Sequence, residues 1–362
     1  MGVNGAFWHG KRVLVTGHTG FKGSWLCLWL LQMGAEVIGY ALPPASERDN
    51  YAACGLEKKV TDVRGNILDA EHLESVLQKY RPEIVFHLAA QPLVRLSYQQ
   101  PKLTYETNVI GTLNVLEAIR HADSVRSAVM VTTDKCYENS QTMRGYRETD
   151  PMGGYDPYSA SKGCAELLIA SCRRSFFAYG GSGPCQTAVA SARAGNVIGG
   201  GDWAADRLIP DCIRAIEAGK PVVLRNPSAV RPWQFVLEPL RGYLMLAERL
   251  WDRPAEFCEG WNFGPDAAQM ATAGEVAGRI AAVLGGEAPS APDGQKGPHE
   301  ATILLLDSTK AGNKLGWRAQ LSLEETVAWT AEWYRGYRRA DPEAICLRQI
   351  RAFHQMQSKE RT

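Results

Sequence analysis

Short apolar runs alternate with segments of helical hydrophobic spacing through the first half of the chain. The runs predict strands at residues 12–16, 36–42, 59–64, 83–90, 127–133 and 186–192. The segments between them predict helices at 25–33, 70–80, 98–121 and 158–177, the first of them amphipathic. Strands that alternate with helices are typical of a parallel sheet covered on both faces. We therefore expect an α/β fold with a doubly wound parallel sheet.

The regular alternation ends near residue 192, and the remainder of the chain has a mixed pattern. Helices are predicted at 208–217, 238–251 and 323–337, and a strand at 221–225. At 362 residues the chain is long enough for two domains with a cleft between them. We predict a first domain at 1–192 and a smaller, mixed substrate-binding domain at 193–362, with segments that return to the first.

The composition is that of an ordinary globular protein, with 45% apolar residues, 22% charged residues and a net charge of +1. This charge favours neither nucleic acid nor an anionic membrane as a partner. No run of 18 apolar residues is present. The nine cysteines are never spaced as C-x-x-C, which argues against a disulfide frame and against a metal site. We expect a cytoplasmic protein.

Three glycines follow the first predicted strand in the pattern G-x-x-G-x-x-G, at Gly17, Gly20 and Gly23. Glycines at this spacing allow a tight turn and a close approach of the backbone to a diphosphate. The loop predicts a Rossmann-type dinucleotide site. The Asp or Glu that usually binds the adenosine ribose, about 20 residues after such a loop, is missing. The sequence therefore gives only weak grounds for choosing between NAD and NADP. Lys22 and Arg48 could meet a 2′-phosphate, although we expect both to be solvated surface charges.

The fourth and fifth predicted strands bring small and polar residues to the carboxyl edge of the sheet, where ligands bind in doubly wound folds. The fourth ends in small residues at 88–90, against which a cofactor could lie. We interpret His87 as a hydrogen-bonded packing residue and expect Asn108, in the following helix, to face solvent. The fifth strand delivers Asp134 and Lys135, which can share one site only if the strand has ended by Asp134.

Tyr158 and Lys162 lie four residues apart in the last predicted helix of the first domain, after a run of prolines and glycines at 151–157. Residues at this spacing share a helix face, so the ammonium can lie near the phenol oxygen. A phenol with a pKa of about 10 needs a nearby cation to ionise near neutral pH. Such a pair alone is often a coincidence, and its catalytic interpretation depends on the glycine loop and the sheet edge.

Together these motifs resemble the extended short-chain dehydrogenase/reductase family over nearly the whole chain, and within it the nucleotide-sugar 4,6-dehydratases. The resemblance is carried by the loop glycines and by residues 88–91, 133–137, 152–162, 193–208 and 225–240. It implies a bound NAD cofactor and a nucleotide-sugar substrate, CDP-glucose. The product would be the 4-keto-6-deoxy sugar, for deoxysugar and O-antigen-type polysaccharide biosynthesis. No residue in these motifs reads cytosine by a mechanism that we can state.

The resemblance also implies roles for five catalytic residues. Tyr158, with its pKa lowered by Lys162 and by the nicotinamide charge, takes the proton of the sugar 4-hydroxyl while C4 gives a hydride to NAD. Thr133 hydrogen-bonds the same region. Water then leaves across C5 and C6, with Asp134 as the acid and Lys135 as the base, and the hydride returns to C6. Many relatives have Glu at the position of Lys135. A lysine base must be neutral at some point, so Lys135 could instead stabilise the enolate by charge.

The residues that would bind the two ligands follow from the same resemblance. For the cofactor they are Gly17, Thr19, Gly20, Phe21, Asn66, Ile67, Leu88, Ala89, Ala90, Thr132, Tyr158, Lys162 and Arg193. For the substrate they are Gln91, Asn196, Arg207 and Arg231, the last three beside the diphosphate. Asn66 stands where related enzymes often have Asp, and its carbonyl would accept from the adenine amino group. The implied assembly is a homodimer or homotetramer. The helices at 98–121 and 158–178 could pair into a four-helix dimer contact, or they could pack on their own sheet.

Two other functions fit part of this pattern. A nucleotide-sugar 4-epimerase shares the glycine loop and the Tyr158–Lys162 pair, but it needs no acid and base beside C5 and C6. A non-catalytic NAD(P)-binding scaffold would have no reason to keep Thr133, Asp134 and Lys135 together with that pair. Asp134 and Lys135 therefore favour a dehydratase.

Overall fold

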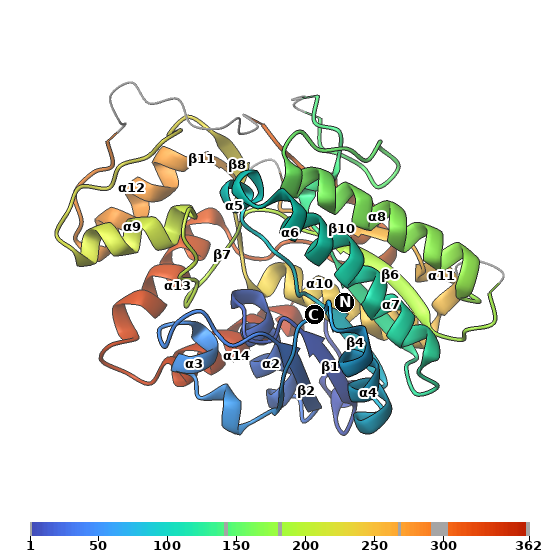
Figure 1. Cartoon of the computed structure of the whole chain (residues 1–362). Coiled ribbons are helices and arrows are strands. Elements are labelled where there is room, and N and C mark those ends of the chain that lie inside the picture. The colour runs from blue at the N-terminus through green and yellow to red at the C-terminus, as the bar shows by residue number, and fades with distance from the viewer. Residues whose placement is uncertain (1, 141–143, 180–182, 267–268, 291–302, 360–362) are drawn as a thin grey trace.

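The protein is built on a seven-stranded parallel sheet with the strand order β10-β6-β5-β4-β1-β2-β3 (Figure 1). The computed structural model describes residues 2–140, 144–179, 183–266, 269–290 and 303–359. The strands are β1 (Arg12–Thr16), β2 (Glu36–Ala41), β3 (Thr61–Arg64), β4 (Ile84–His87), β5 (Ser127–Val131), β6 (Ala188–Arg193) and β10 (Gly260–Asn262). Every neighbouring pair is parallel, which confirms the predicted α/β fold.

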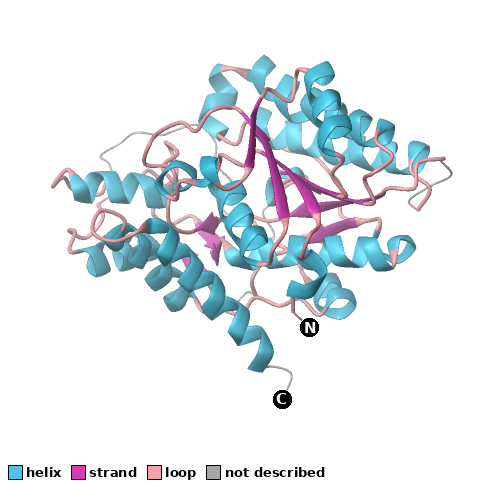
Figure 2. Cartoon of the chain, turned by 90° about the horizontal axis from the view of Figure 1, so that it is seen from below, coloured by secondary structure: helices cyan, strands magenta, loops and turns pink. Residues whose placement is uncertain are grey.

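Helices cover both faces of this sheet, as Figure 2 shows. One face is covered by α4 (Ala70–Tyr80), α7 (Gly111–His121) and α8 (Pro157–Phe176), and the other by α2 (Phe21–Gln32) and α10 (Leu237–Asp252). Side chains on β5 alternate between the two cores: Ala128 and Met130 belong to the first, and Val129 and Val131 to the second. Both faces are apolar and buried, which explains the nearly continuous apolar runs of the predicted strands.

The helix α2 is buried on all sides instead of amphipathic. Its residues from Gly23 to Leu30 are all buried. The C-terminal helix α14 (Pro342–Lys359) packs on α2, where Trp29 meets Phe353 edge-on with ring centroids 5.9 Å apart. A helix enclosed between a sheet and a second helix has no solvated face. The expectation of an amphipathic helix was wrong because a distant segment covers its outer side.

The long helix predicted at 98–121 is broken into shorter pieces. They are α5 (Val94–Gln99), α6 (Pro101–Tyr105), the π-helical turn η2 (Glu106–Ile110) and α7. Pro101 has no N–H to donate and restricts the backbone before it, so the helix ends at Gln100 and restarts. The pattern of apolar positions does not distinguish the wider turn of η2 from a regular helix.

The second half of the chain forms most of a smaller lobe and also completes the sheet. The lobe contains α9 (Leu208–Glu217), α12 (Ala273–Leu284), α13 (Leu323–Gly336) and the antiparallel pair β8 (Val230–Pro232) and β11 (Met270–Thr272), on the left of Figure 1. The strand β10 comes from the same half but pairs with β6. The remaining short elements are α1 (Gly5–Trp8), α3 (Asn50–Ala53), α11 (Pro254–Phe257), β7 (Val197–Ile198), β9 (Gln234–Phe235), η1 (Leu56–Lys58), η3 (Asp134–Cys136) and η5 (Ala311–Leu315).

The strand predicted at 221–225 was wrong. Within the described ranges this segment makes only an isolated bridge, from Val223 to Ser290. The division at residues 192 and 193 stays a prediction. No described helix has the length and apolar character that crossing a membrane requires.

Candidate active site

The loop between β1 and α2 is packed so closely that it requires glycine. Gly17 has a φ of +74°, and a Cβ there would lie 2.7 Å from the backbone N of Ala89, at the exit of β4. A Cβ on Gly23 would overlap the carbonyl oxygen of Gly17. At Gly20, by contrast, a Cβ would meet only that oxygen within 4 Å, at 3.3 Å. Gly20 is also the N-cap of α2 and supplies no side-chain cap, so the first N–H groups of the helix are available to an anion at this opening.

Two threonines hold His87 at the exit of β4. Its Nδ1 lies 2.7 Å from Thr16 Oγ1, and its Nε2 lies 3.0 Å from Thr112 Oγ1. Burial lowers the pKa of His87 to about 3, with a further contribution from the charge of Lys162. The ring is therefore neutral, and the packing role predicted for it is confirmed.

Asn108 connects the same exit to α8. It is fully buried, its Oδ1 accepts from Gln91 N at 2.9 Å, and its Nδ2 donates to Gln91 O at 3.1 Å and to Ser161 Oγ at 2.9 Å. The expectation that Asn108 faces solvent was wrong, because η2 packs against α8 and turns this side chain inward. The only sequence signal was an Asn inside an apolar helical pattern, which has no single interpretation.

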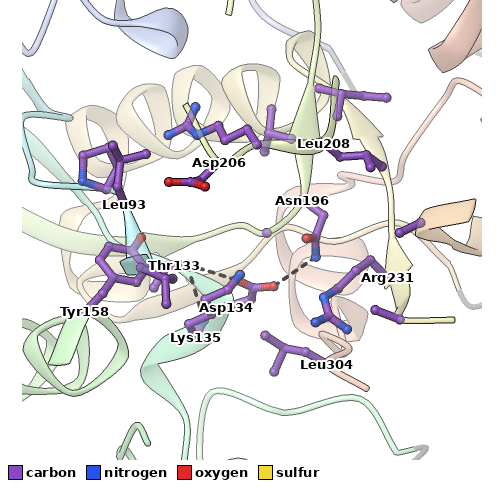
Figure 3. A pocket seen from close by; sticks show the side chains of 18 of the residues that line it. Leu93, Thr133, Asp134, Lys135, Tyr158, Asn196, Asp206, Leu208, Arg231 and Leu304 are labelled. Carbon is purple, nitrogen blue, oxygen red and sulfur yellow. Dashed lines mark hydrogen bonds and ion pairs between the residues drawn. The ribbon is translucent and has the colours of Figure 1, made fainter. Parts of the chain in front are cut away.

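Asp134 lies at the centre of a hydrogen-bonded cluster just beyond β5 (Figure 3). The strand ends at Val131 and the turn η3 follows, so Asp134 and Lys135 can face one site. Asp134 is only 1% exposed, and its carboxylate accepts from Thr133 Oγ1 at 2.9 Å. Two longer contacts reach the same carboxylate, from Lys135 Nζ and from Asn196 Nδ2, both at 3.4 Å.

The start of α8 places Tyr158 against this cluster. Asp156 caps the helix by accepting from Ser159 N at 2.9 Å, and Tyr158 N donates to Ser97 Oγ at 3.1 Å. The phenol is hydrogen-bonded to the side chain of Thr133. Burial raises the pKa of Tyr158 to about 12, since the opposing effects of the Thr133 bond and the Arg207 charge are smaller. In the protein without ligands the phenol therefore keeps its proton, and the lowering of its pKa expected with bound nicotinamide stays a prediction.

Lys162 is a buried cation whose side chain has no partner among the described residues. Its side chain is on the same face of α8 as Tyr158, the residue is 4% exposed, and it makes no hydrogen bond or ion pair with any residue in the described ranges. Burial lowers the pKa of Lys162 to about 8, although the charge of Glu166 partly opposes the shift. An ammonium in this state needs a hydrogen-bond acceptor from a bound ligand.

A cavity of about 640 Å³ opens beside the Asp134 cluster, between the sheet edge and the smaller lobe. Its wall includes nine of the predicted site residues, namely Phe21, Thr132, Thr133, Asp134, Lys135, Tyr158, Asn196, Arg207 and Arg231. Asn196 and Arg231 face the cluster from the opposite side in Figure 3. Arg231 is buried and Arg207 donates to Asp202 at 2.8 Å, so two guanidinium groups are fixed along the wall. The volume falls within the range of small-molecule sites.

Some predicted ligand contacts involve side chains that bond to the protein itself. Gln91 accepts from Leu93 N at 2.6 Å and donates to Thr104 Oγ1 at 2.9 Å, so it fixes the loop after β4. Asn66 is exposed, and its Oδ1 accepts from Leu68 N at 3.0 Å. The substrate contact of Gln91 and the adenine contact of Asn66 stay predictions.

Arg193 belongs to a buried network behind the cavity. It donates to Glu166 Oε2 at 2.7 Å and to the hydroxyl of Tyr137 at 2.5 Å. Glu166 also accepts from Ser191 Oγ at 2.8 Å and from the hydroxyl of Thr132. The network supports the ends of β5 and β6, and the cofactor contact of Arg193 stays a prediction.

Arg48 is a surface charge, as expected, with a side chain that is 39% exposed, whereas Lys22 is only partly exposed. Arg48 stacks on the ring of Trp203, 3.6 Å from its centroid, and donates to Glu217 at 2.5 Å. Lys22, in the first turn of α2, lines the cavity. The spacing of residues along the chain did not reveal that Lys22 lines the cavity, because this placement depends on how the smaller lobe closes over α2.

The described residues fit a bound dinucleotide. The opening beside Gly20 can receive a diphosphate, and the unpartnered ammonium of Lys162 can donate to ribose hydroxyls. Thr19, Ile67, Leu88, Ala89 and Ala90, the other residues predicted to bind the cofactor, follow the carboxyl ends of β1, β3 and β4 along the same edge.

These features define a dinucleotide-dependent enzyme that acts on a ligand held between the sheet edge and the smaller lobe. A family model described as GDP-mannose 4,6 dehydratase matches residues 14–330. The chain belongs to this family.

Individual relatives include both dehydratases and epimerases. The chain is 49% identical over 340 residues to the CDP-glucose 4,6-dehydratase of Salmonella typhimurium, covering 94% of this chain and 95% of the relative. A dTDP-glucose 4,6-dehydratase from Streptomyces venezuelae, solved with NAD bound, superposes with a TM-score of 0.77 at 28% identity, covering 92% and 99% of the two chains. A UDP-glucose 4-epimerase from Thermus thermophilus, solved with NAD, gives a TM-score of 0.75 at 27% identity, covering 90% and 99%.

The unpartnered charge of Lys162 predicts a pH-dependent cost to stability. The folded pKa of about 8 lies below the usual value of 10.5, so the folded state binds the proton less tightly than the unfolded state. The cost is fully present below about pH 8 and disappears as the pH rises toward about 10.5. In cofactor-free protein, Lys162→Met should raise the free energy of unfolding at pH 7 by up to about 3 kcal/mol, measured by urea denaturation.

The matched control is Lys58→Met, which removes an exposed ammonium. It should change the free energy of unfolding by less than about 0.5 kcal/mol at both pH 7 and pH 10. A Lys162→Met variant that is less stable than wild type at pH 7, or whose gain is unchanged at pH 10, contradicts this description of the buried charge.

Proposed function

We propose that this chain is a hydro-lyase that catalyses the NAD-dependent 4,6-dehydration of CDP-glucose to CDP-4-keto-6-deoxyglucose. The observation that carries the proposal is the Asp134–Lys135 pair, which shares one cavity with Thr133 and Tyr158. An acid beside the oxidation site serves the loss of the C6 hydroxyl, and a cation there stabilises the enolate from which that hydroxyl leaves. The 49% identity to a CDP-glucose 4,6-dehydratase over almost the full length of both chains supports the same reaction and substrate.

The first part of the reaction uses Tyr158 and Thr133. NAD supplies the hydride acceptor at C4 and the hydride donor at C6 when it is bound. Thr133 orients the sugar 4-hydroxyl, and Tyr158 receives its proton. Since the phenol is protonated in the protein without ligands, bound ligands must supply the positive charge that makes it a base. The ammonium of Lys162, held on the same helix face, anchors the cofactor beside it.

The second part uses Asp134 and Lys135. Asp134 delivers a proton to the departing C6 hydroxyl. Lys135 Nζ lies 3.4 Å from the Asp134 carboxylate, beside the carbons at which the enolate forms. We assign Lys135 the role of a cation that stabilises the enolate between C4 and C5. Asn196, Arg207 and Arg231 hold the diphosphate along the cavity wall, where guanidinium groups suit phosphate oxygens.

A 4-epimerase is the competing function, because it uses the same fold and an equivalent oxidation at C4. Its solved representative superposes almost as well as the dehydratase does. Lys135 and Asn196 both contact the buried carboxylate of Asp134. Epimerisation does not need this carboxylate, because no hydroxyl leaves C6 in that reaction. This cluster favours dehydration.

We further propose a cytoplasmic homodimer. All nine cysteines are free, as expected in a reducing compartment. Apolar side chains are exposed on adjacent helices, with Leu103 at 39%, Ile110 at 48% and Leu167 at 61%. The elements that carry them, α6, η2 and α8, pack against one another, and we take their exposed side chains as one face; α6 and α8 are labelled in Figure 1. A second copy that pairs with this face by two-fold symmetry covers these side chains.

The dimer predicts that Leu167→Glu yields a monomer, because a charge in the centre of the contact cannot be paired. Sedimentation equilibrium of the holoenzyme measures the change. Val283→Glu, at a 39% exposed position on α12, is the control and should stay dimeric. A monomeric wild type, or a Leu167→Glu variant with unchanged mass, contradicts the proposed contact.

The proposed reaction is tested by incubating the enzyme and NAD with CDP-, dTDP-, UDP- and GDP-linked sugars in deuterated water, followed by mass spectrometry. CDP-glucose should lose one water and gain one deuterium at C5, because the proton removed there exchanges with solvent. An isomer of unchanged mass would establish epimerisation instead, and a preference for another nucleotide would overturn the assigned substrate.

The role of Lys135 is tested by two substitutions that differ in charge. Lys135→Met should still reduce bound NAD on addition of substrate, but form product about 10³-fold more slowly. Lys135→Arg keeps the cation and cannot act as a base near neutral pH, so its rate should exceed that of Lys135→Met by at least about tenfold. Equal rates for the two variants would show that Lys135 acts as a base.

A further inference from the structure

Lys22 contributes an ammonium to the cavity wall that has no role in the steps above. It is the second residue of α2, directly after the glycine loop. It makes no hydrogen bond or ion pair with any residue in the part of the chain that the structure describes. The nearest ring is that of Tyr243 on α10, whose centroid lies 5.9 Å from Lys22 Nζ. The side chain therefore ends in the same cavity as Asp134 and Tyr158, with its hydrogen-bonding capacity free for a ligand.

The surroundings of Lys22 favour the neutral amine over the ammonium. Burial has the largest effect, followed by the positive charges of Arg207 and Lys162, and together they lower the pKa of Lys22 to about 7 against the opposing charge of Asp134. The first turn of α2 adds the positive end of the helix dipole. Arg207 lies in the loop before α9, Lys162 on α8 and Asp134 in η3, and the ring of Tyr243 on α10 lies beside the ammonium.

Lys135 differs from Lys22 in having a charged partner. Its ammonium is paired with the Asp134 carboxylate at 3.4 Å. Lys22 is partly exposed but has no such partner among the described residues. A lysine works as a general base only when its free amine is populated near the working pH.

We propose that Lys22, and not Lys135, is the base that removes the C5 proton in the dehydration. This inference rests on the proposed function. The neutral amine of Lys22 takes the C5 proton, and the electrons of the C5–H bond form the enolate of the 4-ketone beside the Lys135 cation. The enolate then expels the C6 hydroxyl, which leaves as water with the proton of Asp134. After hydride return to C6, the Lys22 ammonium gives a solvent-exchanged proton back to C5. Tyr158 releases the 4-hydroxyl proton to solvent, and Asp134 takes up a proton from solvent in its place.

The test compares Lys22→Met holoenzyme with wild type at separate steps. Rapid mixing with CDP-glucose should reduce bound NAD in both enzymes. Exchange of the C5 proton with deuterated water should be slowed about 10²- to 10⁴-fold in the variant. In wild type the exchange rate should rise with pH to a plateau above about pH 7, following the free amine, and this rise should vanish in the variant. The same substitution at the exposed Lys58 is the control.

Chemical rescue separates a base from a structural role. The truncated variant Lys22→Ala should recover exchange at C5 when ethylamine is added, with rates that follow the free-amine concentration. Exchange at the wild-type rate in Lys22→Met overturns the assignment, as does an Ala variant that added amines do not restore. Loss of cofactor reduction in Lys22→Met would also overturn it, because the residue would then act before the C5 step. The proposed function is judged independently, by water loss in wild type.

Discussion

Parallel pairing of β1, β4 and β5 determines where the functional groups of this chain meet. These three strands are neighbours in the sheet and point the same way, so the segments that follow them emerge at one edge. The glycine loop follows β1, the small residues at 88–90 follow β4, and Thr133 to Lys135 follow β5. The packing of Gly17 against Ala89 fixes the first two segments against each other. A cofactor and a reacting sugar can therefore be held side by side at this edge.

Some of the charged side chains at this edge have no hydrogen-bond or ion-pair partner among the described residues. Asp134 has three donors, whereas Lys162 and Lys22 have no partner among the described residues. Burial then pushes the two lysines toward the neutral amine and keeps the phenol of Tyr158 protonated. The site is completed by its ligands, which bring the acceptors and the positive charge that the side chains lack. Such a site costs stability in the free protein and gains it on binding.

Much of the fold and part of the site could be predicted from the sequence. Six apolar runs became six strands of the sheet, and the loop glycines and the Tyr158–Lys162 helix were found because local spacing determines them. The properties that could not be predicted depend on segments far apart in the chain. Asn108 is buried because η2 packs on α8, and Lys22 lines the cavity because the smaller lobe closes over α2. The ionisation of Tyr158 also depends on its burial and on bound ligands, which spacing along one helix does not show.

Dehydration and epimerisation begin with the same oxidation and differ in where the hydrogen of C4 goes. The most direct measurement uses CDP-glucose that carries deuterium at C4, with NMR spectroscopy and mass spectrometry of the product. We predict a dehydrated product with the deuterium at C6, because the hydride that leaves C4 returns to the carbon that lost its hydroxyl. A product with the deuterium still at C4 and no loss of water would contradict the proposed dehydration, as would a dehydrated product without deuterium at C6.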